Sequence, residues 1–243
     1  DQKTIRLLLT DKHSDFLIPD YQRPYAWGED ECATLWDDLF SFAFPNDDCD
    51  AFDSSADEYF LGPIVTFKND AGQLEIIDGQ QRLTTIMLLL RAFYDKFANM
   101  KDKQSVKVRE SIAGCVWKTD EFDEPDMGAL KIDSEVASDA DKGEFLDILR
   151  HGSVEAGARS AYARNYAFFA RKIADMASEW PTYIALLAAR SLNNVILLPI
   201  EAESQDTALR IFSTLNDRGL PLADADIFKS QFYKHFSAEG RKG

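Results

Sequence analysis

Residues 77–85 read Ile-Asp-Gly-Gln-Gln-Arg-Leu-Thr-Thr, and they join a predicted strand over 73–78 to a predicted helix over about 79–98. Apolar residues recur through the second segment at the spacing of a helix with one wide buried face. The first turn of a helix offers unpaired backbone N–H groups and the positive end of the helix dipole, and both attract anions. Gly79 lets a ligand approach the backbone closely. This stretch therefore predicts an anion site at the start of a long helix.

Polar side chains crowd the same turn. Arg82 could grip a phosphate with two N–H groups, and Asp78 could bind a divalent cation or orient a water molecule. Thr84 and Thr85 add two hydroxyls nearby. A purely structural interpretation stays open, because Asp78 and Gln81 have the three-residue spacing of a helix-capping box.

A second stretch, residues 18–27, reads Ile-Pro-Asp-Tyr-Gln-Arg-Pro-Tyr-Ala-Trp and is predicted to run from a short strand into a loop. Tyr25 and Trp27 could stack on a nucleobase, and Arg23 could meet a phosphate. The two prolines stiffen the loop, so that little ordering entropy is lost on binding. The alternative is that Tyr25 and Trp27 are a buried plug over the core, since large aromatic side chains in loops often only pack.

A third stretch, residues 212–222, reads Phe-Ser-Thr-Leu-Asn-Asp-Arg-Gly-Leu-Pro-Leu and predicts a helix end followed by a turn. Asn216 contributes an amide there, and Arg218 and Lys229 contribute positive charges. A plain corner between two helices is the structural alternative.

The remaining pattern predicts an α+β fold. A strand over 59–67 and the strand over 73–78 flank a turn at 69–72 and predict a hairpin, in which Pro63 favours an edge position or a bulge. We expect a core over 1–99, an inserted all-helical lobe over 100–190, and a returning strand and helices over 191–243. The other predicted elements are helices over 29–42, 144–150, 161–178, 181–190, 204–215 and 223–236, and a strand over 194–200.

The composition excludes several classes of protein. Three cysteines without a C-x-x-C pair argue against a disulfide scaffold and a structural zinc site, and they favour a reducing, cytoplasmic compartment. No apolar run is long enough to span a bilayer. The net charge of −15 disfavours general nucleic-acid binding, yet 22 of the 42 acids lie in 29–58 and 120–147. The rest of the chain is mildly basic and leaves room for a local anion-binding face.

Together the three stretches resemble the N-terminal domain of the GmrSD-type, modification-dependent (type IV) restriction family, a bacterial anti-phage group. The resemblance rests on Ile18-Pro19, Tyr21-Gln22-Arg23, Tyr25, Trp27, Phe60-Leu61-Gly62, the whole run 77–85, Phe212, Leu215-Asn216, Arg218-Gly219, Leu222, Asp226 and Lys229. It covers residues 16 to about 230 in order, with 100–190 matching only as a variable helical region.

The resemblance implies a ParB/sulfiredoxin-like core that binds and hydrolyses a nucleoside triphosphate with Mg²⁺ or another divalent cation. Carried over residue by residue, it implies a catalytic group of Asp78, Gln81 and Arg82, with Asp78 also the metal ligand. It implies a nucleotide site of Tyr21, Gln22, Arg23, Gly79, Gln80, Thr84, Thr85, Asn216, Arg218 and Lys229.

The resemblance also implies partners. These are modified DNA and an HNH-type nuclease, which we expect in a separate domain or subunit because the sequence has no such motif. Hydrolysis would gate that nuclease. One alternative is a sensor without turnover that binds modified DNA through Tyr25 and Trp27, and another is a structural scaffold. The nucleotide, the DNA modification and a homo-oligomeric state stay open.

Overall fold

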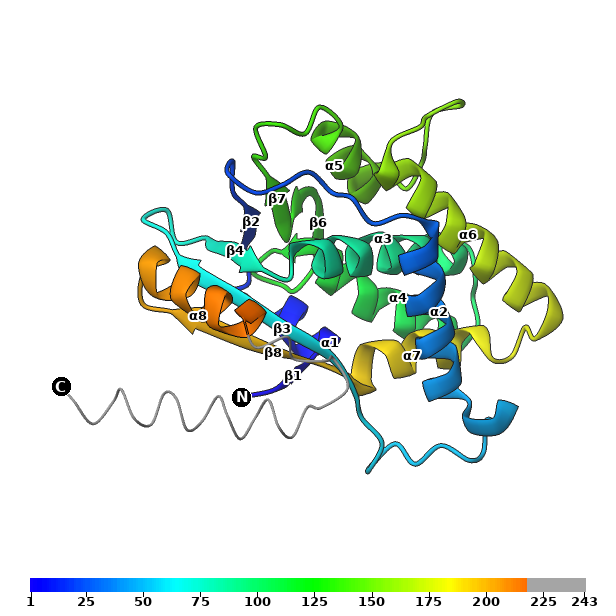
Figure 1. Ribbon diagram of the computed structural model, residues 1–243. Coiled ribbons are helices and arrows are strands. Elements are labelled where there is room, and N and C mark those ends of the chain that lie inside the picture. Colours follow the sequence, from blue (N-terminus) through cyan, green and yellow to red (C-terminus); the bar gives the residue numbers. More distant parts are fainter. Residues whose placement is uncertain (218–243) are drawn as a thin grey trace.

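A mixed sheet and a layer of helices form the body of the molecule in the computed structural model, which describes residues 1–217 (Figure 1). The α+β class is confirmed. The strands are β1 (Lys3–Thr4), β2 (Phe16–Ile18), β3 (Tyr59–Lys68), β4 (Leu74–Asp78), β5 (Trp117–Thr119), β6 (Pro125–Leu130), β7 (Ile132–Ser134) and β8 (Val195–Ala202). The helices are α1 (Ile5–Thr10), α2 (Glu29–Ala43), the short 3-10 helix Pro45–Asp47, α3 (Gln80–Phe97), α4 (Lys103–Val116), α5 (Lys142–His151), α6 (Ala161–Glu179), α7 (Ile184–Asn194) and α8 (Gln205–Asp217).

The main sheet has the strand order β1-β8-β3-β4-β2-β7. β3 and β4 pair antiparallel, which confirms the predicted hairpin, whereas β3 runs parallel to β8 and β2 runs parallel to both β4 and β7. The prediction that Pro63 marks an edge strand is wrong, because β3 lies inside the sheet. A register shift against β8 between Phe60 and Gly62 supplies the bulge that was the other expectation.

The long helix α3 is the centre of the core, and most of its 18 residues are buried. Its apolar side chains belong to one large cluster that also takes in residues of α2, α4, α6 and α7. Because α3 starts directly after β4, the packing of this helix fixes where the polar turn 78–82 lies.

The middle of the chain is not all helical, contrary to expectation. β5 and β6 form a separate hairpin, and β7 pairs with β2 in the main sheet. The short strand β7 was missed because three residues carry too little periodicity to identify a strand. The division into 1–99, 100–190 and 191–243 stays a prediction.

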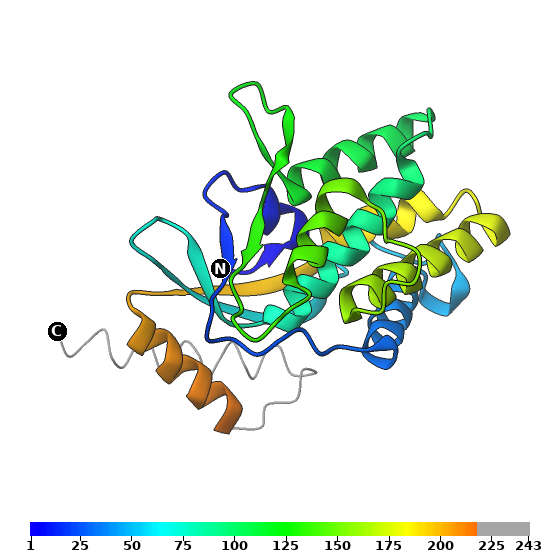
Figure 2. The same ribbon diagram turned by 90° about the horizontal axis from the view of Figure 1, so that it is seen from above.

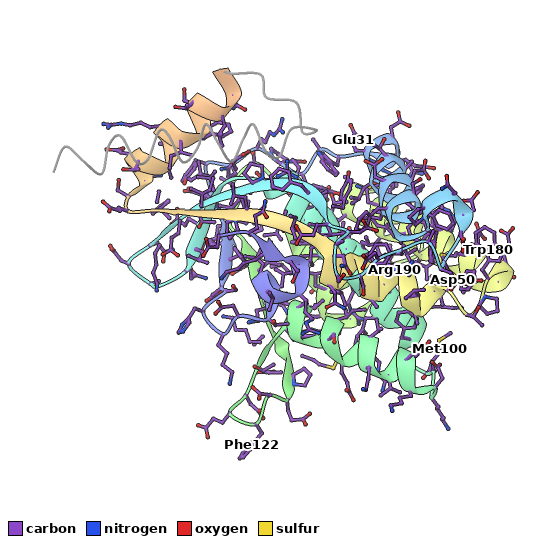
Figure 3. All side chains as sticks on the ribbon, turned by 90° about the horizontal axis from the view of Figure 1, so that it is seen from below. Glu31, Asp50, Met100, Phe122, Trp180 and Arg190 are labelled. Carbon is purple, nitrogen blue, oxygen red and sulfur yellow. The ribbon has the colours of Figure 1, made fainter. Side chains whose placement is uncertain are left out.

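The β5–β6 hairpin projects from the body, and Phe122 at its tip is 83% exposed (Figure 3). Of the helices in residues 1–217, α8 lies on the opposite side of the sheet from the helical layer (Figure 2). Among residues 1–217, no helix combines the length and the apolar character needed to cross a bilayer.

Candidate functional site

A cavity of about 620 Å³ lies at the N-terminus of α3. It brings together the three stretches that the sequence singled out, 18–27, 77–85 and 212–222, although they lie far apart along the chain. The loop between β2 and α2 passes the start of α3 on the side where α8 ends (Figure 2). The lining residues are Gln22, Arg23 and Trp27 from the loop, Ile77, Asp78, Gly79, Gln80, Gln81 and Arg82 from the turn, and Phe212 and Asn216 from α8.

The N-terminus of α3 is not capped by a side chain. Gly79 is the N-cap residue, with φ at 94°, in the left-handed region that favours glycine. A Cβ atom at this position would lie 2.5 Å from Ile64 Cδ1 and 2.9 Å from the Pro63 carbonyl oxygen. Because Gly79 and not Asp78 is the N-cap residue, the capping-box interpretation of Asp78 and Gln81 is wrong, and the uncapped first turn of the helix lines the cavity.

Arg82 folds back onto β3. One of its Nη atoms donates to the Pro63 carbonyl oxygen at 2.7 Å. The guanidinium also lies against Gly62, where a Cβ atom would be 2.6 Å from Arg82 Cζ. Within residues 1–217 no carboxylate forms an ion pair with this arginine. Burial lowers the pKa of Arg82, while the charge of Asp78 opposes that shift.

Asp78 and Arg23 are the other charged residues among the described part of the cavity lining. Burial raises the pKa of the Asp78 carboxyl, and the neighbouring Arg82 and Arg23 partly oppose the shift. Arg23 is exposed. One carboxylate between two guanidinium groups can accept a cation and polyanion together, because the arginines bind phosphate oxygens and the carboxylate binds Mg²⁺.

Three glutamines, Gln22, Gln80 and Gln81, form hydrogen bonds between the loop that follows β2 and the segment where β4 ends and α3 begins. Gln22 Nε2 donates to the carbonyl oxygens of Ile76 and Ile77 at 2.9 and 3.1 Å, and Gln80 Nε2 donates to that of Arg23 at 2.7 Å.

Gln81 bonds the loop at both ends of its amide. Its Oε1 accepts from the Ala26 N–H at 2.8 Å, and its Nε2 donates to the Pro24 carbonyl oxygen at 3.3 Å. Gln81 thus positions the loop, and it also lines the cavity, so that its catalytic role stays a prediction.

Tyr25 is a buried plug and not a stacking platform, so its predicted contact with DNA is wrong. Its side chain is 6% exposed and its ring stacks on that of Tyr162, with 4.8 Å between the centroids. Its hydroxyl shares hydrogen bonds of 2.7 Å with Thr85 Oγ1 and with Asn165 Nδ2. Burial raises the pKa of Tyr25. Trp27, by contrast, is partly exposed and lines the cavity.

Three further predicted residues lie elsewhere. Thr84 and Thr85 are fully buried in the first turns of α3 and do not line the cavity. Tyr21 is 49% exposed, and its hydroxyl donates to Glu75 Oε2 at 3.4 Å. It lines a second pocket, of about 560 Å³, that also contains the carboxylates of Asp20, Asp70, Glu75, Glu135 and Glu203. Such a pocket repels polyanions.

Asn216 reaches the cavity from α8, as the sequence predicted. Arg218 and Lys229 lie outside the described residues.

Comparison with known families bears on the same stretches, because residues 5–233 match the family described as GmrSD restriction endonuclease, N-terminal domain. The chain belongs to this family. No curated protein matches the sequence.

Membership of the GmrSD N-terminal family places the domain in a DNA restriction system. The structure adds roles for two residues of the predicted motifs. Gly62 makes room for the Arg82 guanidinium, and Phe212 lines the cavity beside Asn216. Both residues belong to the motifs that carry the family resemblance, so those motifs could have indicated that Gly62 and Phe212 contribute to the site. Asn165 was missed, because nothing in the sequence relates it to a loop that is 138 residues away.

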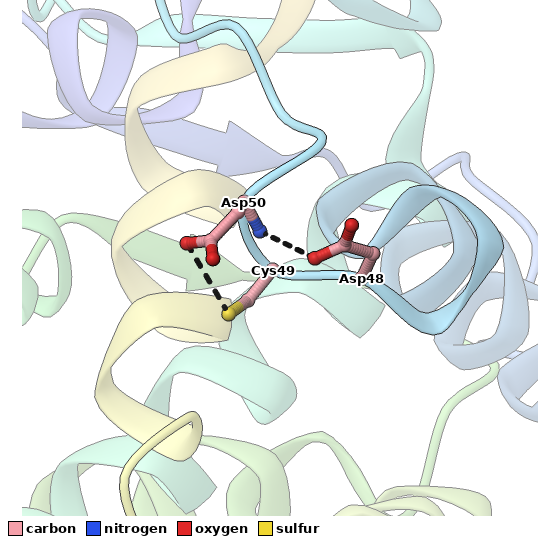
Figure 4. A group of neighbouring side chains, drawn as sticks. All are labelled: Asp48, Cys49 and Asp50. Atoms are coloured by element: carbon pink, nitrogen blue, oxygen red, sulfur yellow. Dashed lines mark hydrogen bonds between the residues drawn. The ribbon is translucent and has the colours of Figure 1, made fainter.

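Among the described residues that line the cavity, Asp78 is the potential metal ligand. Among residues 1–217, the group of at least three such side chains is Asp48, Cys49 and Asp50. They belong to one loop, where the Asp50 N–H donates to Asp48 Oδ1 at 2.9 Å and Cys49 Sγ lies 3.8 Å from Asp50 Oδ1 (Figure 4). These local contacts explain the cluster as a turn. Asp78 is the carboxylate of the described lining that could hold a divalent cation.

Proposed function

We propose that this domain binds a nucleoside triphosphate with Mg²⁺ in the cavity at the start of α3 and hydrolyses it. One observation carries the proposal: an uncapped helix N-terminus, two guanidinium groups and one carboxylate line the same cavity. Backbone N–H groups and arginines bind phosphate oxygens, and a helix N-terminus favours negative charge.

The lining residues divide the work of hydrolysis. The N–H groups of the first turn of α3 hold the phosphates, and Arg82 and Arg23 neutralise the charge that develops as the terminal phosphoryl group is transferred to water. Asp78 holds the cation or orients the attacking water. Mg²⁺ supplies charge neutralisation between neighbouring phosphates. Gln22, Gln80 and Gln81 keep the loop, and with it Arg23 and Trp27, at the cavity.

The family supports a larger setting for this activity. We propose that hydrolysis gates an HNH-type nuclease in a separate domain or subunit, and that the system restricts modified DNA in the bacterial cytoplasm. An allosteric gate of this kind needs only that the nuclease-competent state and the other state bind the nucleotide differently.

Phosphate release is the direct test. The purified protein is mixed with each of the four ribonucleoside triphosphates and Mg²⁺, and inorganic phosphate is followed with time. Arg23→Ala is the informative variant, because Arg23 is exposed and its loss spares the core. We expect a fall of about tenfold or more, the size of one charge-assisted hydrogen bond. Arg171→Ala, on the exposed face of α6, is the matched control. Absence of release by the folded wild-type protein contradicts the proposal.

A sensor without turnover is the second candidate, and the exposure of Trp27 in the cavity favours it. With Tyr25 buried, Trp27 is the aromatic side chain of residues 18–27 that lines this cavity. The sensor predicts that Trp27→Ala weakens binding to modified duplex DNA by the stacking free energy of about 1–3 kcal/mol per base. Equal affinity for modified and unmodified duplexes in a gel shift argues against it.

A further inference from the structure

The helix α8 packs against the sheet through an apolar cluster of its own. This cluster is separate from the large core around α3. Both ribbon views place α8 on the side of the sheet away from the other long helices (Figures 1 and 2). The buried members of the cluster are Val65 and Ile77 from the β3–β4 hairpin, Leu198, Ile200 and Ala202 from β8, and Ala208 and Ile211 from α8 itself.

The attachment of α8 is small. Among the described residues, two side chains of this helix, Ala208 and Ile211, are buried, and Phe212 and Leu215 pack partly buried against the same cluster, whereas most of α3 is buried. An element with few buried apolar contacts opens locally at a lower free energy than the core does. Local opening of α8 therefore leaves the main core intact.

The same helix forms one wall of the cavity. Phe212 and Asn216 lie one turn apart on α8 and line the cavity from that side. The opposite wall is the first turn of α3 with Arg82, which the main core holds in place. A ligand that fills the cavity thus contacts both α3 and α8, and within the described residues the small apolar cluster holds α8 to the sheet.

We propose that α8 is a ligand-responsive helix: a nucleotide held by the start of α3 and by Phe212 and Asn216 fastens α8 to the sheet. This inference rests on the proposed function. Occupancy of the cavity then sets the fraction of time for which α8 is docked, because a ligand that binds only the docked state stabilises it by mass action. Residue 218 follows α8 directly, so docking of this helix is a means of passing the state of the site along the chain.

Hydrogen–deuterium exchange of the peptide 205–217 tests the inference. Exchange is measured without nucleotide and with a non-hydrolysable triphosphate and Mg²⁺ at about 100 times the dissociation constant. At that concentration, a ligand that binds only the docked state slows exchange through the opening of α8 by up to about 100-fold. A thermal shift on the same samples establishes whether nucleotide binds at all. We expect slower exchange over 205–217. A thermal shift with unchanged exchange there overturns this inference and leaves the proposed function standing. No thermal shift with any triphosphate overturns both.

Matched variants on α8 separate contact with the ligand from helix stability. Phe212→Ala and Asn216→Ala each remove part of the cavity wall, and we expect them to abolish most of the nucleotide-dependent protection. Because Phe212 also packs against the apolar cluster, the exchange of each variant with nucleotide is compared with its own exchange without nucleotide. Leu209→Ala is the control, because Leu209 is 43% exposed and is absent from the cavity lining. It should retain the full ligand effect. Equal protection in all three variants contradicts the inference.

Discussion

Gly79 is the residue on which the geometry of the site depends most. Its positive φ ends β4 and starts α3 within one residue, and it permits the β3 backbone to pass at van der Waals distance. No other residue type meets both conditions without strain.

Replacement of Gly79 by alanine is expected to destabilise the protein more than the same change at Gly72. Both glycines have positive φ, so both changes carry the left-handed cost of about 1–2 kcal/mol. Only at Gly79 does the new Cβ meet Ile64 and Pro63, whereas nothing lies within 4 Å of that position at Gly72. Urea unfolding of the two variants measures the difference. Equal losses would show that the close approach of β3 is not a constraint.

The ionisation of Asp78 makes the stability of the protein depend on pH. Because burial raises its pKa above the ordinary value of 3.8, the native protein holds a proton in a pH range where the unfolded chain has already released it. Stability contributed by this group is therefore lost as pH rises through the raised pKa. Asp78→Asn removes the ionisation, and its melting temperature should exceed that of the wild type at neutral pH.

The test is whether the melting temperature of Asp78→Asn lies above or below that of the wild type. The advantage of Asp78→Asn should shrink below pH 3.8, where the wild-type carboxyl is protonated in both states. Asp175→Asn on the exposed face of α6 should show no such trend. A variant that melts below the wild type at neutral pH contradicts the assignment of a buried, destabilising carboxylate that is retained for function.

The sequence predicted the residues of the turn better than those of the loop. Asp78, Gly79 and Arg82 lie at a strand end and a helix start, and local pattern alone locates such a junction. The burial of Tyr25 depends on Asn165 and Tyr162, which come from a distant helix. Burial of that kind is a property of tertiary packing, and no local pattern encodes it.

At the scale of elements, the loop between β2 and α2 is held by α3. Gln80 and Gln81 connect the first turn of the helix to loop backbone that is more than 50 residues away. The period of apolar residues predicted α3 and the β3–β4 hairpin closely. The same apolar period did not predict that Gln80 and Gln81 hydrogen-bond to the loop backbone, because bonds to backbone groups require no complementary side chain in the sequence.

Gln81→Ala is expected to loosen the loop. The change removes two hydrogen bonds and leaves a backbone N–H and a carbonyl without their partners, which costs about 1–3 kcal/mol in the free energy of unfolding. Nucleotide affinity should fall as well, because Arg23 and Trp27 lose their fixed positions. Urea unfolding and a thermal shift with nucleotide measure the two effects. The same substitution at the exposed Gln104 of α4 should change neither.

At the scale of the whole molecule, charge is divided between neighbouring surfaces. Among residues 1–217, the cavity at α3 is lined by one carboxylate and two arginines, while the second pocket, at Tyr21, gathers five carboxylates. This division explains how a chain with a net charge of −15 can offer a site for polyanions. Net charge alone pointed away from such a site, because it averages over segments that fold far apart.

The most direct measurement is a titration of the ¹⁵N-labelled protein with a non-hydrolysable triphosphate and Mg²⁺, followed by backbone amide NMR. The account predicts that the amides of Gly79, Gln80, Gln81 and Arg82 shift and saturate together, while that of Glu75 in the acidic pocket does not. Saturating shifts that centre on the acidic pocket, or no shifts at any concentration, would contradict it.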